Sequence, residues 1–437
     1  MTRLKKVWLD LNSSLWFLPA LMVAGAIALA VGLIEADGLI GERWLARWPR
    51  LFGAGVEGSR GMLSAIAGSM ITITGVIFSI TIVALALASS QYTPRILRNF
   101  MRDRTNQFVL GFFVGVFAYC IVVLRTLRSS DEGRFLPSLA VLAGIALALA
   151  SVGVLILFIH HIVTSIQANT IISTAARETI AVVRKLFPQE LGDEADEAPE
   201  AFAGEGWQPI ASVRTGYIQS VDADGLLEFA RSRKVVVRME CGIGEFIVEK
   251  APLVSLRPTS PLDAGAVAEL RALYSIGDFR TIEQDAGFGI RQIVDIALKA
   301  LSPGINDTTT AVTCVEYLGA ILAAAAAQRM ESPSRCDGET LRVLARGLTF
   351  ERMTAEACDQ IRGSAKGNVA VLIALLGALG TTAKQTRNTA RQRILRQQVE
   401  LVAELADTSL ATAYDRAQVD VATSDARADL GGQSATH

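Results

Sequence analysis

The sequence has few charged, aromatic and histidine residues for its length. Of 437 residues, 19% are charged, 6% are aromatic and only 3 are histidine. Soluble domains usually carry about 25% charged residues, so the composition points to a membrane protein. A nucleic-acid-binding protein would concentrate basic charge on one domain with interleaved aromatic residues, and the low aromatic content argues against this class. A hydrophobic fraction of 51% excludes an intrinsically disordered chain.

Cysteine is also sparse, and no two cysteines form a C-x-x-C pair. The five cysteines are Cys120, Cys241, Cys314, Cys336 and Cys358. Such wide spacing fits neither a disulfide framework nor a zinc ribbon. We therefore expect free thiols in a reducing compartment, and we expect no metal ion and no cofactor.

Four segments of the first half contain no Asp, Glu, Lys or Arg. In chain order they are residues 11–34, 61–94, 105–124 and 135–176. A helix needs roughly 20 apolar residues to cross a bilayer, so each segment is long enough to cross once. The sequence predicts a transmembrane domain over residues 1–188 with four helices, the fourth extending beyond the bilayer.

The charged residues are divided unequally between the two halves. Residues 1–176 hold 14 Lys and Arg against 8 Asp and Glu, whereas residues 177–437 hold 28 against 35. The loop after the second segment carries Arg95, Arg98, Arg102 and Arg104 against a single Asp103. Because basic loops stay in the cytoplasm, we expect both termini and the whole second half to be cytoplasmic, in a bacterial inner membrane.

The second segment carries a stripe of small and hydroxyl side chains. Ser64, Gly68, Thr72, Gly75 and Ser79 are spaced by 4, 4, 3 and 4 residues, so they share one helix face. One interpretation is a pore-lining face in a homo-oligomer, where the hydroxyl groups meet water. The alternative, which this pattern alone favours, is a packing face between helices.

No predicted membrane helix has a charged residue near its centre. Buried charges are typical of proton relays and ion-coupled carriers. Their absence argues against a carrier and, more weakly, favours a passive conduit for small ions or a simple membrane anchor.

The second half is predicted to be a cytosolic α+β domain. We expect an acidic linker over 189–209, a small β domain over 210–260, a helical domain over 261–414 and a disordered tail over 415–437. The strand and glycine rhythm of the β domain resembles a barrel-sandwich domain of the biotinyl or lipoyl type. The modified lysine of that type is absent, so only the shape is carried over. The fold class is therefore a membrane α-helical domain followed by a part that is β-barrel-like or sandwich-like and a part that is helical.

Charged residues are densest between Arg280 and Asp307. Arg291, Asp295 and Lys299 are spaced four residues apart, which places them on one face of a helix. The turn at Pro303-Gly304 precedes Asn306 or Asp307, either of which can cap the next helix. We interpret the patch as a coupling node of paired charges, between subunits or between the cytosolic domain and the membrane helices. Its members are Arg280, Glu283, Asp285, Arg291, Asp295, Lys299, Asn306 and Asp307.

A catalytic interpretation of this patch is weaker. It would use Glu283, Asp285 and Asp307 as acid–base groups or as oxygen ligands of a hard cation. The second half has no histidine before His437, and it has no nucleophile elbow, P-loop or GxGxxG motif. We therefore expect no enzymatic activity.

Three segments resemble a widespread bacterial family of membrane proteins known only as a domain of unknown function. They are Ser79 to Phe100, Gln284 to Ala297, and the motif Ser302-Pro-Gly-Ile-Asn-Asp. The family pattern places proline after Asn-Asp, where this chain has Thr308. The resemblance covers nearly the whole chain and implies a topology, without a reaction or a substrate.

The sequence thus favours a homo-oligomeric, channel-like conduit for small ions that is regulated by its cytosolic domain. The alternative is a non-conducting scaffold or envelope-maintenance protein anchored in the lipid bilayer. Neither interpretation involves nucleic acid.

Overall fold

The computed structural model describes residues 16–39, 55–91, 103–127, 137–186, 206–257, 262–328, 334–338 and 340–431. Most of the arginine-rich loop over 95–104, most of the acidic linker and the last six residues lie outside these ranges. The chain divides into two compact units, Met1–Gln167 and Ala168–His437. Each unit is described by itself.

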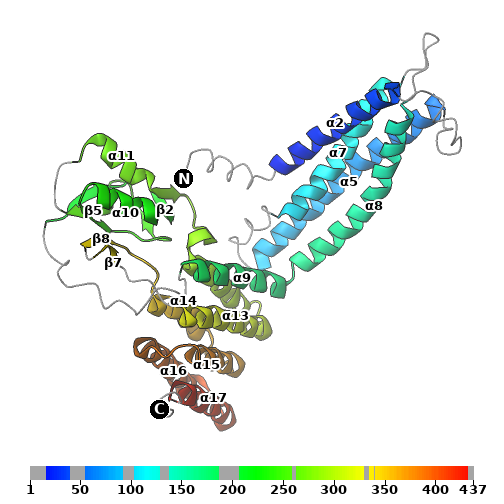
Figure 1. Cartoon of the computed structure of the whole chain (residues 1–437). Helices are drawn as coiled ribbons and strands as arrows, with labels where there is room; N and C mark the ends of the chain where they lie inside the picture. The colour runs from blue at the N-terminus through cyan, green and yellow to red at the C-terminus, as the bar shows by residue number, and fades with distance from the viewer. Residues whose placement is uncertain are drawn as a thin grey trace. The chain divides into compact units, whose positions relative to one another are not determined.

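In its described residues, the first unit is a bundle of long apolar helices (Figure 1). They are α2 (Phe17–Leu39), α5 (Val56–Gln91), α7 (Arg104–Thr126) and α8 (Ser138–Ser165). Their boundaries follow the charge-free segments because each helix ends close to the first charged or loop-forming residues. At 1.5 Å per residue, the 36 residues of α5 span about 54 Å, well beyond a hydrocarbon core of about 30 Å.

Contacts between residues far apart in the sequence show the directions of the helices. Leu63, near the start of α5, lies against Gly144, near the start of α8. The Asp37 carboxylate, near the end of α2, accepts a hydrogen bond from the Leu139 backbone N–H at the start of α8. His161, near the end of α8, contacts Asp103, the N-cap of α7. The end of α2 and the start of α8 therefore lie on one side of the bundle, and the end of α8 and the start of α7 on the other. This is the up-and-down arrangement that four crossings require.

Close helix packing in this unit depends on glycine. A Cβ at Gly111 of α7 would lie 2.9 Å from the Cα of Pro19 in α2, and one at Gly115 would lie 3.4 Å from the Cβ of Ala26. The two glycines, four residues apart, let these parallel helices approach closely, as small residues do in membrane bundles. Large apolar side chains such as Phe78 and Leu149 remain exposed on the outside, as expected of a surface that faces lipid.

Five helices of the described residues are long and apolar enough to cross a membrane, one more than the four expected. The fifth is α13 (Thr308–Ala327) in the second unit, and its mean hydropathy of 1.6 is lower than the 2.4–2.7 of the other four. It packs against α9 (Ala168–Leu186), α12 (Ala286–Ala300) and α15 (Val369–Ala383). Glu316 interrupts this segment, so it is not one of the charge-free runs.

In the described residues, the β part of the second unit contains two open sheets, so of the barrel-like or sandwich-like shapes predicted, a closed barrel is not formed. The five-stranded sheet has the order β1-β5-β3-β8-β7, and the three-stranded sheet has the order β4-β2-β6. All pairs are antiparallel except β3–β8, which is parallel. Ile218, Val237 and Leu256 are buried in the core of the β part. The strands are β1 (Gln208–Ala211), β2 (Gly216–Val221), β3 (Val236–Met239), β4 (Phe246–Ile247), β5 (Pro252–Arg257), β6 (Tyr274–Gly277), β7 (Ser334–Asp337) and β8 (Thr340–Leu344).

Three of these strands lie outside the predicted β domain of 210–260. β6 follows the short helix α11 (Ala264–Ala272), and the hairpin β7–β8 follows α13. Val237 of β3 pairs with Val343 of β8, so a segment from the predicted helical domain completes the sheet. The helix α10 (Ala223–Ser232) packs against β3 and β8.

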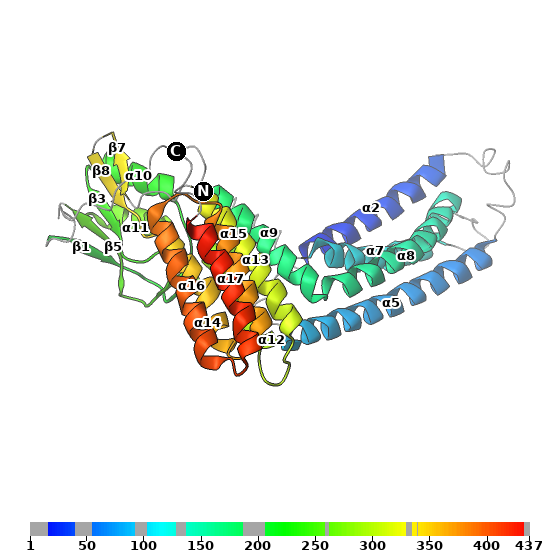
Figure 2. The same cartoon turned by 90° about the horizontal axis from the view of Figure 1, so that it is seen from below.

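The helical part of the second unit begins earlier and ends later than predicted (Figure 2). It includes α9, which the sequence analysis assigns to the membrane domain, because buried Ile172 and Thr179 pack it against α12 and α13. It also includes α17, over residues expected to be disordered, because Val419 and Ala426 are buried there. The remaining helices are α14 (Phe350–Ser364), α16 (Thr389–Ser409) and α17 (Ala413–Gly431).

Candidate functional site

The α5 helix has two opposite faces with different chemistry. Its buried side chains pack against α7 and α8 inside the first unit. These buried residues are Leu63, Ala67, Met70, Ile77, Ala84 and Ala88. With about 100° between successive residues, their spacing defines one continuous face of the helix.

The five predicted stripe residues of α5 are all exposed in the first unit. We call Ser64, Gly68, Thr72, Gly75 and Ser79 the α5 stripe. The centre of this stripe lies roughly 160° around the helix from the buried face. It therefore points directly away from the rest of the bundle.

This position excludes a packing face within the described part of the first unit. A Cβ built at Gly68 or Gly75 meets no atom within 4 Å, so neither glycine is needed for contacts inside the unit. The Thr72 hydroxyl donates to the Gly68 carbonyl at 2.9 Å and is satisfied within its own helix. The stripe is therefore free to face lipid, water or another chain.

His161 lies at the opposite end of the bundle from the start of α5. Its Nε2 lies 2.5 Å from Asp103 Oδ2 and 3.3 Å from Ser165 Oγ. Asp103 also accepts from the Thr105 backbone N–H and so caps α7. The contact is a hydrogen-bonded histidine at a helix end, which joins the ends of two membrane helices.

In the second unit, the predicted coupling node is centred on an ion pair between Arg280 and Asp285. Arg280 Nε donates to Asp285 Oδ2 at 2.8 Å, and Nη2 donates to Oδ1 at 2.9 Å. The Asp285 side chain is only 5% exposed, and it also caps α12 by accepting from the Phe288 backbone N–H. This two-bond geometry is the strong form of an arginine–carboxylate pair.

Two glycines enclose this ion pair. Gly244, in the loop between β3 and β4, has a φ of +82°, and a Cβ there would overlap the Asp285 carboxylate. Gly287 lies on the other side, in the first turn of α12, where a Cβ would lie 3.3 Å from both Asp285 Oδ1 and Arg280 Nη2. The β part therefore touches the helical part directly at Asp285.

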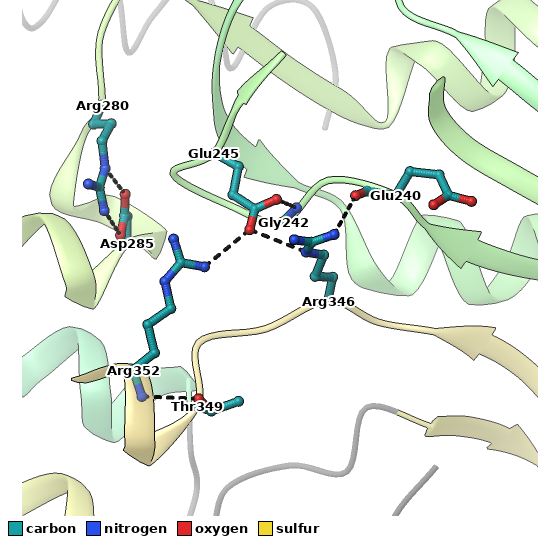
Figure 3. A network of polar contacts seen from close by, with 8 residues as sticks. All are labelled: Glu240, Gly242, Glu245, Arg280, Asp285, Arg346, Thr349 and Arg352. Atoms are coloured by element: carbon teal, nitrogen blue, oxygen red, sulfur yellow. Dashed lines mark hydrogen bonds and ion pairs between the residues drawn. The ribbon is translucent and has the colours of Figure 1, made fainter. Parts of the chain in front are cut away.

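A second cluster of ion pairs lies beside the first one (Figure 3). Glu245, in the same loop as Gly244, accepts from Arg352 of α14 at 3.1 Å and pairs with Arg346 at 3.2 Å. Its other oxygen accepts from the Gly242 backbone N–H at 3.1 Å. Burial opposes ionisation of Glu245, but the Gly242 N–H and the guanidinium groups of Arg352 and Arg346 outweigh it and lower its pKa.

Glu356 of α14 completes this group of charges. A Cβ at Gly287 would lie 3.3 Å from Glu356 Oε2, which places this carboxylate next to Arg280 and Asp285. Burial is the main cause that raises the pKa of Glu356, and the Asp285 charge raises it further, while Arg280 opposes the shift. We call Glu245, Arg280, Asp285, Arg346, Arg352 and Glu356 the charged junction.

The other predicted node residues lie outside the charged junction. Arg291 and Asp295 form their own pair at 2.9 Å on one face of α12. Glu283 and Lys299 are exposed. Asp307 caps α13 by accepting from the Thr310 N–H and hydroxyl, which confirms a cap at this position. The Thr310 hydroxyl and N–H lower the pKa of Asp307, and Asn306 precedes it with a φ of +50°.

The sequence analysis missed Glu245, Arg346, Arg352 and Glu356. Arg352 and Glu356 are four residues apart in α14, so their helical spacing was the one available signal. Glu245 is 107 residues from Arg352, and no local pattern connects them. Within the described part of the chain, no group of three or more His, Cys, Asp or Glu residues could hold a metal ion.

Comparison with known proteins gives one family and several relatives. The model of the family described as "Predicted membrane protein (DUF2254)" matches residues 12–381. An uncharacterized protein of Mycobacterium tuberculosis is 34% identical over 429 residues, which cover 96% of this chain and 81% of the relative. An uncharacterized protein of Mycobacterium bovis has the same identity and coverage. No solved structure matches the chain.

Proposed function

The chain belongs to the DUF2254 family of predicted membrane proteins, and we propose that it is a homo-oligomeric conduit for small ions in the bacterial inner membrane. In this proposal α2, α5, α7 and α8 cross the bilayer and both termini are cytoplasmic. The second unit lies in the cytoplasm and regulates the conduit. The proposal includes no catalytic step.

The proposed topology has two supports. The contacts of Asp37 with Leu139 and of His161 with Asp103 make α8 antiparallel to α2 and α7. Leu63 lies against Gly144, which brings the start of α5 to the start of α8. The loop after α5 carries four arginines, which favours a cytoplasmic position. The fifth apolar helix, α13, is assigned to the core of the second unit because Leu318, Ile321 and Leu322 are buried there.

The observation that carries the proposal is the outward position of the α5 stripe. An outer face that meets only lipid has no need of glycine and hydroxyl side chains, and the same helix exposes Ile71, Val76 and Phe78 beside the stripe. Copies of the chain arranged around an axis would place the stripe at that axis. Hydroxyl and backbone groups would then line the path, with no charged residue from 61 to 94.

The non-conducting scaffold remains the second candidate, and one observation favours it. Small residues at this spacing also pack helices of different chains together, and the Thr72 hydroxyl is already satisfied within α5. In that case the stripe would hold an oligomer together without enclosing water.

Ion flux in liposomes separates the two candidates. The variant Gly68→Trp places a bulky ring in the middle of the stripe, and the matched control Ser69→Trp makes a similar change about 100° around the helix. Both positions are exposed in the first unit. We expect flux from the wild type and from Ser69→Trp, and a loss of flux with an intact oligomer from Gly68→Trp.

Two results would contradict the conduit. No flux from the wild type under any voltage, tension or pH would favour the scaffold. Dissociation of the oligomer by Gly68→Trp, with no pathway for ions in the wild type, would identify the stripe as a packing face between chains.

A further inference from the structure

Glu356 is a carboxylate surrounded by charges but bonded to none of them. The charged groups that face it are Arg280, Asp285, Arg291 of α12 and Arg352 of its own helix. Helices α13, α15 and α16 also pack against α14 and contribute no further charge. Within the described ranges, Glu356 takes part in no hydrogen bond and no ion pair. Glu356 is only partly exposed, and burial penalises its ionised form.

Glu356 and Asp285 are close enough to repel each other. Both Glu356 Oε2 and Asp285 Oδ1 would lie 3.3 Å from a Cβ at Gly287, so the two oxygens are at most twice that distance apart. Two carboxylates that share a site are not both easily ionised. Arg280 Nη2 lies 3.3 Å from the same point, within reach of either acid, and in the structure it donates to Asp285.

The position of Arg280 matters to the β part. Gly244 rests directly against the Asp285 carboxylate, and its backbone N–H donates to the Ile218 carbonyl of β2 at 2.8 Å. A movement of the Arg280–Asp285 pair would therefore disturb the loop over residues 242–245. The same loop is held to α14 by the pair of Glu245 with Arg352.

We propose that Glu356 is a proton-responsive switch that controls how firmly the loop over 242–245 is docked on the helical part. When Glu356 is protonated, it no longer repels Asp285, and Arg280 remains bonded to Asp285 with the loop docked. When Glu356 is ionised, it repels Asp285 and competes for Arg280, and the loop is loosened. Burial of Glu356 favours the protonated form, which brings its titration closer to neutral pH. This switch goes beyond the proposed conduit and does not require that the protein conduct ions.

Amide hydrogen exchange of the loop tests the switch in the full-length protein in detergent or nanodiscs. Exchange is measured between about pH 5 and pH 8 and is corrected for its intrinsic pH dependence. Because the pKa of Glu245 is lowered, Glu245 stays ionised throughout this range and does not contribute to the change. We expect the protection of Gly244 to fall about tenfold as pH rises, which corresponds to about 1.4 kcal/mol in the free energy of docking. Glu356→Gln should keep the high protection at every pH. Glu351→Gln, an exposed change on the same helix, should behave as wild type.

A second variant keeps the test informative if Glu356→Gln does not fold. Asp285→Asn preserves the cap of α12, because asparagine is also a good N-cap residue, but it removes the competing charge. In this variant, the pH midpoint of the change in Gly244 protection should lie below the midpoint of the wild type. The switch is wrong if the wild type shows no pH dependence in this loop, if Glu356→Gln keeps the same dependence, or if Asp285→Asn leaves the midpoint unchanged.

Discussion

Gly289 of α12 and Thr179 of α9 are in such close contact that a methyl group at position 289 would overlap the Thr179 side chain. Thr179 is fully buried, and its hydroxyl donates to the Ala175 carbonyl at 2.6 Å. Only Ile166 and Gln167 separate α9 from the end of α8. The helix α9, which follows α8 after these two residues, is therefore fixed in the core of the second unit.

The first prediction concerns this contact. Gly289→Ala should destabilise the second unit by about 1–3 kcal/mol, because the added methyl group must displace α9. Adding Thr179→Ala should recover part of the loss, since it removes the overlapping hydroxyl. The measurement is urea unfolding of the full-length protein in detergent, followed by the reactivity of Cys314 and Cys358, which are buried in this unit.

Gly377→Ala is the matched control for this prediction. Gly377 also lies within a helix, but a Cβ there meets no atom within 4 Å. Alanine should stabilise α15 by up to about 1 kcal/mol, because it is the better helix former. Equal effects of Gly289→Ala and Gly377→Ala would show that the Thr179 contact carries no packing cost.

The second prediction ranks three ion pairs by burial. Asp285→Ala should cost the most, about 3–5 kcal/mol, because it breaks the pair with the most buried carboxylate and removes the cap of α12. Asp295→Ala should cost less, since Asp295 and Arg291 are 15% and 25% exposed. Glu400→Ala should cost no more than about 1 kcal/mol, because its pair with Arg427 is half exposed.

Double variants test whether each pair acts as a unit. Arg280→Ala should add little to Asp285→Ala, and Arg291→Ala little to Asp295→Ala. The unfolding assay above and the oligomeric state are both recorded. If Asp295→Ala changes neither assembly nor stability, the coupling role predicted for the Arg291–Asp295 pair is wrong. If Asp285→Asn and Asp307→Asn keep the stability but abolish an activity, the patch is a cation or catalytic site instead.

The third prediction concerns acid. Because its partners lower the pKa of Glu245, its ionised form stabilises the folded state relative to the unfolded one. This contribution is complete above the ordinary carboxyl pKa of 4.5 and is lost as pH falls through the lower value in the folded protein. Glu245→Gln should therefore be less stable than wild type near neutral pH, and the difference should shrink below about pH 4.5. A difference that grows on acidification would contradict the assignment.

The membrane helices could be predicted from the sequence because their signal is local. The charge-free run over 61–94 corresponds to α5, and the run over 105–124 corresponds to α7. Bilayer thickness sets the length of such a run, and the polarity of each residue indicates whether it lies in lipid or in water. Helical spacing alone predicts that the residues of the α5 stripe share one face. Spacing does not predict that this face is exposed, because exposure depends on which face of α5 is covered by α7 and α8.

The second unit could be predicted only in part because its contacts are between distant residues. The pair of Arg280 with Asp285 lies within five residues, and the sequence places both in one patch. The pairing of Val237 with Val343, by contrast, joins β3 to a strand more than a hundred residues later. A similar distance separates Glu245 from Arg352, so no local pattern connects these two members of the charged junction.

The last prediction concerns topology, and it tests the helix directions separately from the orientation. Cysteines introduced at Gly55 and Ser138, which precede α5 and start α8, should share one side of the membrane, because α7 returns the chain between them. Arg104→Cys, at the start of α7, should lie on the opposite side. Each is tested in a cysteine-free background with a membrane-impermeant maleimide on intact spheroplasts. Labelling of Gly55→Cys but not of Ser138→Cys would contradict the up-and-down bundle itself.

If Gly55→Cys and Ser138→Cys behave alike, the orientation of the bundle follows from the side of the membrane on which they react. The arginine-rich loop predicts that Gly55→Cys and Ser138→Cys react on intact spheroplasts, and that Arg104→Cys reacts only after permeabilisation. The reverse pattern would leave the bundle intact but place the second unit outside the cytoplasm, where regulation by cytosolic protons could not act.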